Sequence, residues 1–371
     1  MIRAWFLLCL TLITCRAQEL PDGITAGNDY TSIPIPAARY QIYLIGEFHG
    51  AQETKSFLAG YLVGLHRQVG LRDVALEEDQ VYQTAARDYV DGKTTELPSA
   101  LCLRADVLNT VRRFNDSVPA NQRILVHLID IDSPLRAIRQ HLADVKDSLG
   151  AGTVVIPDEQ SVREMGYELI DQMRPLARDS ATNAELDTIR SSIEANREGV
   201  EIGISLSDTK GNVLVEAREK AIARNMLTVL KNSARGVALG FYGGIHVRKR
   251  PLSLPFENGQ MFDYKSLAVR LMEAGVSVAS ISCEALSGST SWRGMNRPLP
   301  PQAGNYRVSQ HLTMEEVIAK VPTAEFFWLE SAKQPALSFS VTNQNLAEIF
   351  DFVLFIKDAT PMQNTCAPAE P

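Results

Sequence analysis

Short apolar runs that alternate with helix-like stretches constrain the fold of this chain most strongly. Seven such runs lie near residues 41–46, 73–78, 123–131, 236–242, 276–283, 325–330 and 350–357. Between the first two, apolar side chains from Phe57 to Leu65 recur at helical spacing, which predicts a strand–helix–strand unit. The run at 236–242 shows no polar alternation, as expected for a strand that is covered on both faces. The pattern predicts an α/β fold with a mostly parallel sheet flanked by helices.

Residues from about 135 to 230 differ from the rest, because they combine long helical patterns with few strand signals. Two apolar stripes recur there at helical spacing, namely Met165, Leu169 and Met173, and Leu186, Ile189 and Ile193. We expect a helical insertion that caps the C-terminal ends of the strands. The alternative is a helical unit that only packs at the periphery. Residues 18–371 are otherwise expected to form a single α/β hydrolase-like domain.

The first 17 residues have the layout of a secretory signal peptide. Arg3 precedes an apolar run that is too short to span a bilayer, and the small residue Ala17 lies at a suitable cleavage site. We therefore expect an exported protein, periplasmic or extracellular, with no membrane attachment after cleavage. A lipoprotein ranks second, because the residues before Cys15 match a lipidation site poorly, and an uncleaved anchor is a further alternative.

The charge and cysteine content exclude several classes of protein. The chain has 37 Lys and Arg against 44 Asp and Glu, a formal net charge of −7, which argues against nucleic acid or an anionic membrane as a partner. Past the signal peptide only Cys102, Cys283 and Cys366 remain. Three cysteines allow one disulfide at most and form no CxxC pair for metal or redox chemistry.

The first apolar run ends in a sequence that can deliver reactive groups. It reads Gly46-Glu47-Phe48-His49-Gly50, a carboxylate and an imidazole between two glycines. Glycine reaches backbone angles that other residues avoid, so the pair can occupy a tight bend. Because open parallel sheets bind ligands at the carboxyl ends of their strands, this bend is the first candidate for a site.

Further acids and a histidine follow the other predicted strands. Glu77 follows the second run, Asp130 and Asp132 end the third, and His246 follows the fourth after Gly243 and Gly244. If the strands are parallel, these side chains join Glu47 and His49 on one edge of the sheet. Acids and imidazoles together suit general acid–base catalysis, and they also ligate zinc, manganese or iron.

Several neighbouring residues have structural explanations that compete with a catalytic one. Asp130 and Asp132 suit capping of the next helix as well as they suit catalysis. Glu78 and Asp79 are expected in a solvated turn, and Glu53 is expected as a first-turn acid favoured by the helix dipole. His66, His141 and His311 are expected at the surface, and His127 as a hydrogen-bonded histidine of the core.

The absence of several well-known motifs excludes the active sites that depend on them. The chain has no Gly-x-Ser-x-Gly elbow, no His-Glu-x-x-His helix, no P-loop and no Gly-x-Gly-x-x-Gly after a strand. Cys283 is followed by Glu284 at a strand end, but no thiol-protease motif surrounds it, so a structural cysteine is expected. The remaining chemistry is water activated by histidine and glutamate, with or without a metal.

Several sequence segments of this chain resemble the erythromycin esterase-like family. That family belongs to the superfamily that also holds Tiki-type metalloproteases and haem-binding uptake lipoproteins. The matching segments are Leu44–Glu53, Ala75–Glu77, Arg112–Asn115, Arg218–Met226, Gly243–Lys249 and Phe350–Lys357, in the expected order over most of the chain. The family's motif has one residue more between its glutamate and its histidine than this chain, in which only Phe48 separates Glu47 from His49. The paired Gly-x-x-His of the Tiki-type proteins also fits Gly46 with His49 and Gly243 with His246.

The resemblance implies an α/β sheet with a helical insertion and a cleft at the strand ends. It implies that His49 activates water as a general base, that Glu47 and Glu77 orient it or share its proton, and that His246 positions substrate or stabilises negative charge. Arg218 matches the family's motif arginine and is expected to form an ion pair with the acidic cluster.

Together these observations predict an exported hydrolase that cleaves an ester or lactone in a small-molecule substrate, with Glu47, His49, Glu77 and His246 as its catalytic residues. No cofactor is required in this interpretation, although a divalent metal is compatible with it. Two alternatives remain. One is a metal-dependent peptidase of Tiki type with Glu47, His49 and His246 as ligands, and the other is a protein that binds haem or a small ligand in the same cleft.

Overall fold

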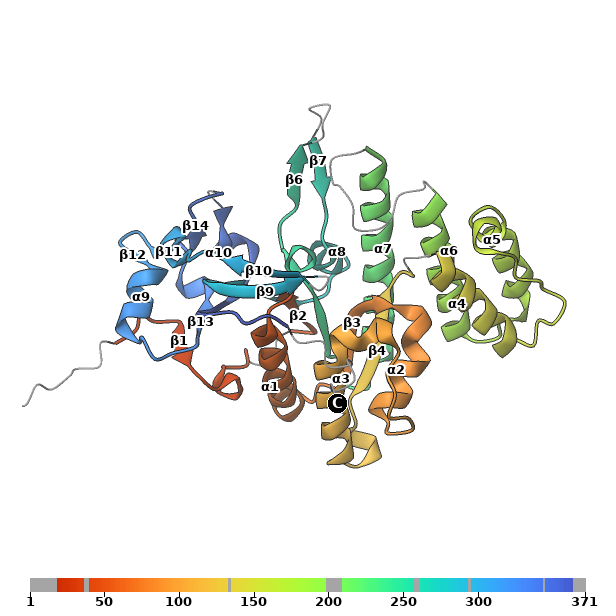
Figure 1. Cartoon of the computed structure of the whole chain (residues 1–371), viewed down its shortest axis with the longest axis horizontal. Coiled ribbons are helices and arrows are strands. Elements are labelled where there is room, and N and C mark those ends of the chain that lie inside the picture. Colours follow the sequence, from red (N-terminus) through yellow and green to blue (C-terminus); the bar gives the residue numbers. More distant parts are fainter. Residues whose placement is uncertain are drawn as a thin grey trace, which may run out of the picture.

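The computed structural model describes residues 19–36, 40–132, 135–197, 209–255, 261–292, 295–342 and 344–362. An eight-stranded sheet forms its centre (Figure 1). In order across the sheet the strands are β1 (Ile24–Gly27), β13 (Phe326–Glu330), β16 (Phe352–Ile356), β8 (Val278–Ala285), β2 (Ile42–Glu47), β5 (Ala238–Gly243), β3 (Asp73–Asp79) and β4 (Leu125–Asp130). All neighbours from β16 to β4 are parallel, whereas β13 runs antiparallel to both of its neighbours.

The seven apolar runs of the sequence form seven of these strands, so the predicted α/β fold with a mostly parallel sheet is confirmed. Central strands β2 and β5 are buried along their whole length, which explains why their sequences show no polar alternation. Strand β1 has no comparable apolar run. It is held at the sheet edge by antiparallel pairing with β13.

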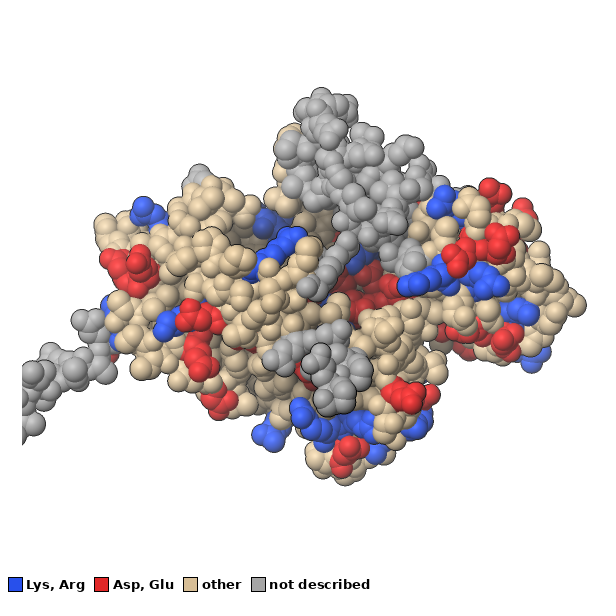
Figure 2. Space-filling view, in the orientation of Figure 1, with Lys and Arg blue, Asp and Glu red and all other residues tan. Residues whose placement is uncertain are grey.

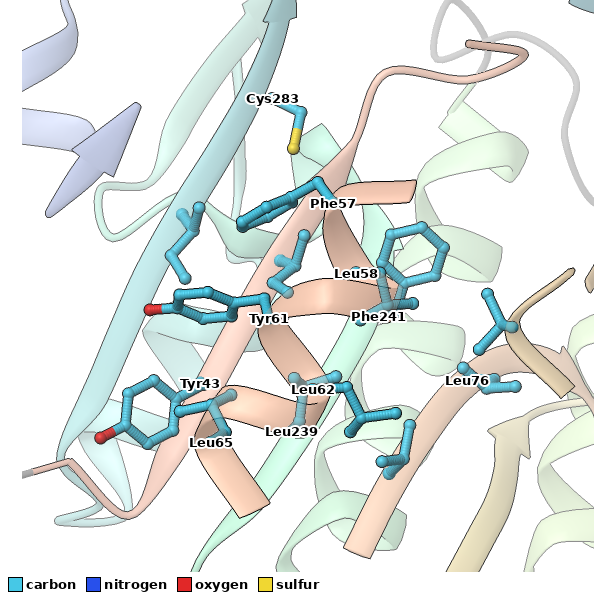
Figure 3. Packing of buried hydrophobic residues seen from close by; sticks show 14 of the residues in the cluster. Tyr43, Phe57, Leu58, Tyr61, Leu62, Leu65, Leu76, Leu239, Phe241 and Cys283 are labelled. Carbon is cyan, nitrogen blue, oxygen red and sulfur yellow. The ribbon is translucent and has the colours of Figure 1, made fainter. Parts of the chain in front are cut away.

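Helices cover both faces of the sheet. On one face lie α1 (Gln52–Val69), α2 (Gln83–Val90) and α3 (Ala105–Asp116), and on the other lie α7 (Thr209–Asn232) and α8 (Leu267–Glu273). Figure 3 shows the apolar face of α1, with Phe57, Leu58, Tyr61, Leu62 and Leu65, packed against side chains of the strands. The spacing that predicted this helix therefore also defines its buried face.

A separate group of helices follows β4. Helices α4 (Leu135–Ser148), α5 (Glu159–Met173) and α6 (Ser180–Arg197) pack on one another, and α6 also packs on α7 (Figure 1). They share their own apolar core, which we call the helical-unit core: Ile138, Leu142, Val145, Ala151, Val154, Val162, Leu169, Ile170, Met173, Leu186, Ile189 and Ile193. Five of the six residues in the two predicted stripes belong to it, whereas Met165 is 44% exposed.

The C-terminal third adds several smaller elements to the central sheet. These are the hairpins β6 (Leu252–Pro255) with β7 (Met261–Tyr264) and β9 (Gly288–Trp292) with β10 (Met295–Leu299), the strands β11 (Tyr306–Ser309), β12 (Leu312–Thr313), β14 (Ser338–Phe339) and β15 (Gln344–Asn345), and the helices α9 (Met314–Lys320) and α10 (Leu346–Ile349). Cys102 is disulfide-bonded, and Cys283 is a buried free thiol.

No helix within the described ranges is long and apolar enough to cross a membrane. The predicted signal peptide lies outside the described residues. Export of the protein therefore stays a prediction from the sequence.

Candidate active site

The carboxyl ends of β2, β3 and β5 lie side by side in the sheet. Glu47, the last residue of β2, is in register with Gly243 at the end of β5. On the other side of β5, the carboxylate of Glu77 in β3 accepts a hydrogen bond from the backbone N–H of Gly243 at 2.7 Å. The parallel arrangement thus brings the predicted acids to one edge, as the sequence analysis expected.

Glycines make the close approach of these chain segments possible. A Cβ on Gly46 would lie 2.6 Å from Cγ2 of Val247, so the segment after β5 packs directly on the β2 backbone. Gly50 has φ +82°, in the region that favours glycine, and its carbonyl accepts hydrogen bonds from the N–H groups of Ser291 and Met362. The turn that carries Glu47 and His49 is therefore fixed from both ends.

A first cluster forms around Glu47. Its Oε1 lies 2.9 Å from Nδ1 of His49, and both of its oxygens accept hydrogen bonds at 2.9 Å from Nη1 of Arg104, at the end of the 3₁₀ helix η3 (Ser99–Arg104). Arg104 also donates to Glu78 at 2.8 Å. Burial alone would raise the pKa of Glu47, but the Arg104 guanidinium and the His49 ring outweigh it and lower the pKa to about 2. Glu47 is therefore ionised at neutral pH.

A second cluster forms around His246, in the 3₁₀ helix η6 (Gly244–Val247). Its Nε2 lies 3.3 Å from Oε1 of Glu77, and its Nδ1 contacts the carboxylate of Glu219 in α7. Burial alone would lower the pKa of His246, but Glu219 and Glu77 outweigh burial and raise it to about 10. His246 is therefore a cation at neutral pH, which makes it a hydrogen-bond donor and excludes it as a base.

Arg218, next to Glu219 in α7, ties two strand ends together. It donates to Glu77 at 2.6 Å through Nη2 and to Oδ1 of Asp130 at 2.9 Å through Nε. The expected ion pair of Arg218 with the acidic cluster is confirmed. Asp130, the last residue of β4, belongs to this ion pair and therefore contributes to the edge of the site.

The two clusters meet at Gly243. A Cβ on this glycine would lie 2.5 Å from Nε2 of His49 and 3.6 Å from Cδ2 of His246, so both rings border the same backbone position. The side chain of His49 is 41% exposed, whereas those of Glu47, Glu77 and His246 are 6%, 12% and 7% exposed. The structure thus brings the four sequence-predicted residues together and leaves His49 as the most accessible of them. Figure 2 shows acidic side chains gathered in a hollow of the surface beside the helical unit.

Sequence reasoning missed three residues of these clusters. Arg104 follows no strand and has no motif, and it lies 57 residues from its partner Glu47. Glu219 directly follows the motif residue Arg218, which is the one signal that could have pointed to it. The hydroxyl of Tyr264 in β7 lies 3.4 Å from Nδ1 of His246, and nothing in the local sequence indicated this contact.

Other expectations for neighbouring polar residues were wrong. Glu78 is not in a solvated turn but forms the ion pair with Arg104. His141 is not at the surface. It is buried in α4, with Nδ1 at 2.6 Å from Asp132, which also accepts the N–H of Val81 at 2.9 Å. Asp132 therefore ties the end of β4 to the helical unit and does not enter the site.

The carboxylates and histidines of the site are not arranged to bind one metal ion together. No group of three or more His, Cys, Asp and Glu side chains in the described ranges is arranged to hold one. Both oxygens of Glu47 bind Arg104, and both ring nitrogens of His246 face carboxylates. A ligand set of Glu47, His49 and His246 would have to give up these partners.

A separate groove of about 450 Å³ lies between α7 and α8. It is lined by Lys220, Ala223, Arg224, Leu227, Thr228, Lys231, Arg270 and Glu273. None of the strand-end residues lines it, so the groove carries no part of the chemistry described above.

Comparison with known proteins supports the fold. No family model matches the chain, and a search of curated proteins gave no match by sequence. The fold is similar to that of a histidine-to-asparagine mutant of the erythromycin esterase EreC in its open conformation, with a TM-score of 0.64, 14% identity, and coverage of 91% of this chain and 98% of that one.

Two further solved structures are similar. A succinoglycan biosynthesis protein has a TM-score of 0.64, 14% identity, and coverage of 91% of this chain and 95% of its own. A Bacillus cereus protein has a TM-score of 0.59, 14% identity, and coverage of 87% and 89%. The resemblance to the erythromycin esterase-like family is therefore confirmed at the level of the fold.

Proposed function

We propose that this protein is an exported hydrolase that opens an ester or lactone bond in a small-molecule substrate with a water molecule activated by His49. The proposal rests mainly on two carboxylate–histidine pairs that both border Gly243. The pair Glu47–His49 is accessible through His49, whereas the pair Glu77–His246 is buried and its histidine is cationic. The fold shared with an erythromycin esterase supports a hydrolase, whereas bond type, substrate and export belong to the proposal.

Each residue of the first cluster has a separate role in the proposed reaction. Glu47 accepts a hydrogen bond from the Nδ1–H of His49, which leaves the basic lone pair of the ring on Nε2. Nε2 takes a proton from water as the water oxygen attacks the carbonyl carbon. Arg104 keeps Glu47 ionised, so the imidazolium formed on His49 is stabilised by a nearby negative charge.

Negative charge then develops on the carbonyl oxygen of the substrate. His246 supplies a buried cation beside His49 to stabilise it, and Glu77 and Arg218 hold that cation in place. The carbon–oxygen bond to the leaving group breaks, and His49 returns its proton to the departing alkoxide. Water is consumed, and one acid and one alcohol are released, or one hydroxy acid when the substrate is a lactone.

Hydrolysis of a panel of esters and lactones by the wild type and by His49→Ala tests the proposal. We expect His49→Ala to lower the rate at least about a hundred-fold, because an essential general base is lost. His311→Ala replaces an exposed histidine that belongs to neither cluster and is expected to keep the wild-type rate. Equal rates in the wild type and in His49→Ala would overturn the assignment of the base.

A further inference from the structure

His246 is held between carboxylates that come from two different elements. Glu77 in β3 faces its Nε2 at 3.3 Å, and Glu219 in α7 contacts its Nδ1. Glu219 is only 1% exposed, and within the described ranges His246 is the one basic side chain with which it forms an ion pair. A buried carboxylate is costly unless it is paired, so this contact is the physical reason for an acid at position 219.

The geometry on both sides of the ring determines its protonation state. A neutral imidazole donates from one nitrogen and presents a lone pair at the other. A lone pair directed at an ionised carboxylate is repulsive, so two ionised carboxylates at the two nitrogens are accommodated only when both nitrogens carry a proton. Within the described ranges, the Tyr264 hydroxyl from β7 also lies 3.4 Å from Nδ1 of His246, and the ring of Tyr242 from β5 lies 6.0 Å from the His246 ring. Arg218 from α7 donates to Glu77. None of them supplies a second acceptor as strong as the two carboxylates.

His49 has a different environment. Its Nδ1 contacts the carboxylate of Glu47, and 41% of its side chain is exposed. Two histidines that border the same glycine therefore differ in exposure, since only 7% of the His246 side chain is exposed. Environments that push the proton affinities of neighbouring groups apart assign the roles of acid and base in an active site.

We propose that Glu219 is a positioning residue, which orients the His246 ring and keeps both ring nitrogens protonated, so that His246 acts as a fixed cation while His49 acts as the base. This proposal rests on the hydrolysis proposed above. It also explains the adjacent charges of α7, because Arg218 holds Glu77 and Asp130 while Glu219 holds His246. One turn of α7 thus fixes the charge distribution at the edge of the sheet.

The isosteric variant Glu219→Gln tests the proposal through nuclear magnetic resonance of ¹⁵N-labelled histidine side chains. In the wild type we expect both nitrogens of His246 to give protonated imidazolium signals up to about pH 9, in line with the pKa of about 10. In Glu219→Gln we expect the ring to lose a proton at a pH at least one to two units lower. The matched control is Glu216→Gln, also in α7, whose carboxylate contacts Arg270 and Lys220 and not His246.

Kinetics supply a second, independent readout. The wild-type kcat should stay level up to the pH at which His246 titrates, whereas Glu219→Gln should bring the falling limb to a lower pH. We expect kcat of the variant at pH 9 to be up to about ten-fold lower than that of the wild type, with a smaller change in KM. Glu219→Asp, which keeps the charge, should restore part of the difference.

The two readouts separate failure of this proposal from failure of the proposed hydrolysis. A neutral His246 in the wild type at pH 8 would overturn the role of Glu219 even if the protein hydrolyses esters, and this measurement needs no variant. An unchanged titration of His246 in folded Glu219→Gln would overturn it as well. If no ester or lactone is hydrolysed while the titration shifts as expected, the charge assignment stands and the proposed reaction does not.

Discussion

At the residue scale, Arg104 holds the first cluster together. Its guanidinium binds Glu47 and Glu78 and lies over the ring of Phe241, with its carbon 5.3 Å from the ring centroid. The side chain is only 9% exposed, so both ion pairs are largely shielded from water. Removing one partner of a buried pair leaves an uncompensated charge and is therefore more costly than removing an exposed arginine.

We predict that Arg104→Met lowers the free energy of unfolding by about 3 to 5 kcal/mol at pH 7, because Glu47 and Glu78 stay buried without their cation. The measurement is urea denaturation. The exposed Arg297 in β10 forms no ion pair within the described ranges, and Arg297→Met should change the free energy by less than about 0.5 kcal/mol. A similar small change for Arg104→Met would contradict the prediction.

The same cluster predicts a dependence of stability on pH. The pKa of Glu47 is lowered from 4.5 to about 2, so its contribution is fully present above pH 4.5 and is lost as the pH falls toward 2. A shift of this size corresponds to at most about 3 kcal/mol. In Arg104→Met this part of the acid dependence should shrink, and unfolding curves between pH 2 and pH 5 would show it.

At the scale of elements, one buried pair joins the sheet to the helical unit. Asp132 directly after β4 is fully buried, and its carboxylate lies 2.6 Å from Nδ1 of His141 in α4. Burial alone would lower the pKa of His141, but Asp132 and Glu185 outweigh burial and raise it to about 10. The contribution of this histidine to stability is therefore complete below pH 6.5 and is lost as the pH rises through 10.

We predict that Asp132→Asn destabilises α4 by about 3 to 5 kcal/mol at pH 6, because it leaves the His141 cation buried. The loss should be smaller at pH 10, where the ring is neutral in half of the molecules. Amide hydrogen exchange of α4 measures both effects. Asp144→Asn, in an exposed position of the same helix, is the control and should leave exchange nearly unchanged. Equal losses at both pH values would show that the charge of His141 is not involved.

At the scale of the whole molecule, each face of the sheet has its own apolar core, and the helical unit has a third one. The helical-unit core contains no residue of the main sheet, and its helices reach the sheet through α7 and through the Asp132–His141 pair. Regions with separate cores open as separate cooperative units. We therefore expect the helical unit to unfold while the sheet stays intact.

We predict that Leu142→Ala, at a fully buried position of the helical-unit core, destabilises α4, α5 and α6 by about 2 to 5 kcal/mol and leaves β2, β5 and β8 protected. Native-state hydrogen exchange resolves the two regions. Leu44→Ala in β2 is the control, since loss of the sheet should unfold the whole molecule. Equal loss of protection in sheet and helical unit upon Leu142→Ala would show that the protein unfolds as one unit.

The sequence by itself determined seven strands of the main sheet, their mostly parallel arrangement, and the position of Glu47, His49, Glu77 and His246 at or near strand ends. It could do so because strand and helix periodicity are local, and because the carboxyl ends of parallel strands share one edge. Each of these residues lies within three residues of a strand end, so its place followed from the fold class alone.

Only the tertiary structure decided which charged side chains surround these four catalytic candidates. Arg104 reaches Glu47 over 57 residues and Arg218 reaches Glu77 over 141, and no local pattern encodes contacts of that range. The same holds for Asp130 and Asp132, two residues apart, of which one joins the site and the other anchors the helical unit. The charge state of each histidine depends on these long-range neighbours, because burial and nearby carboxylates set the pKa of an imidazole.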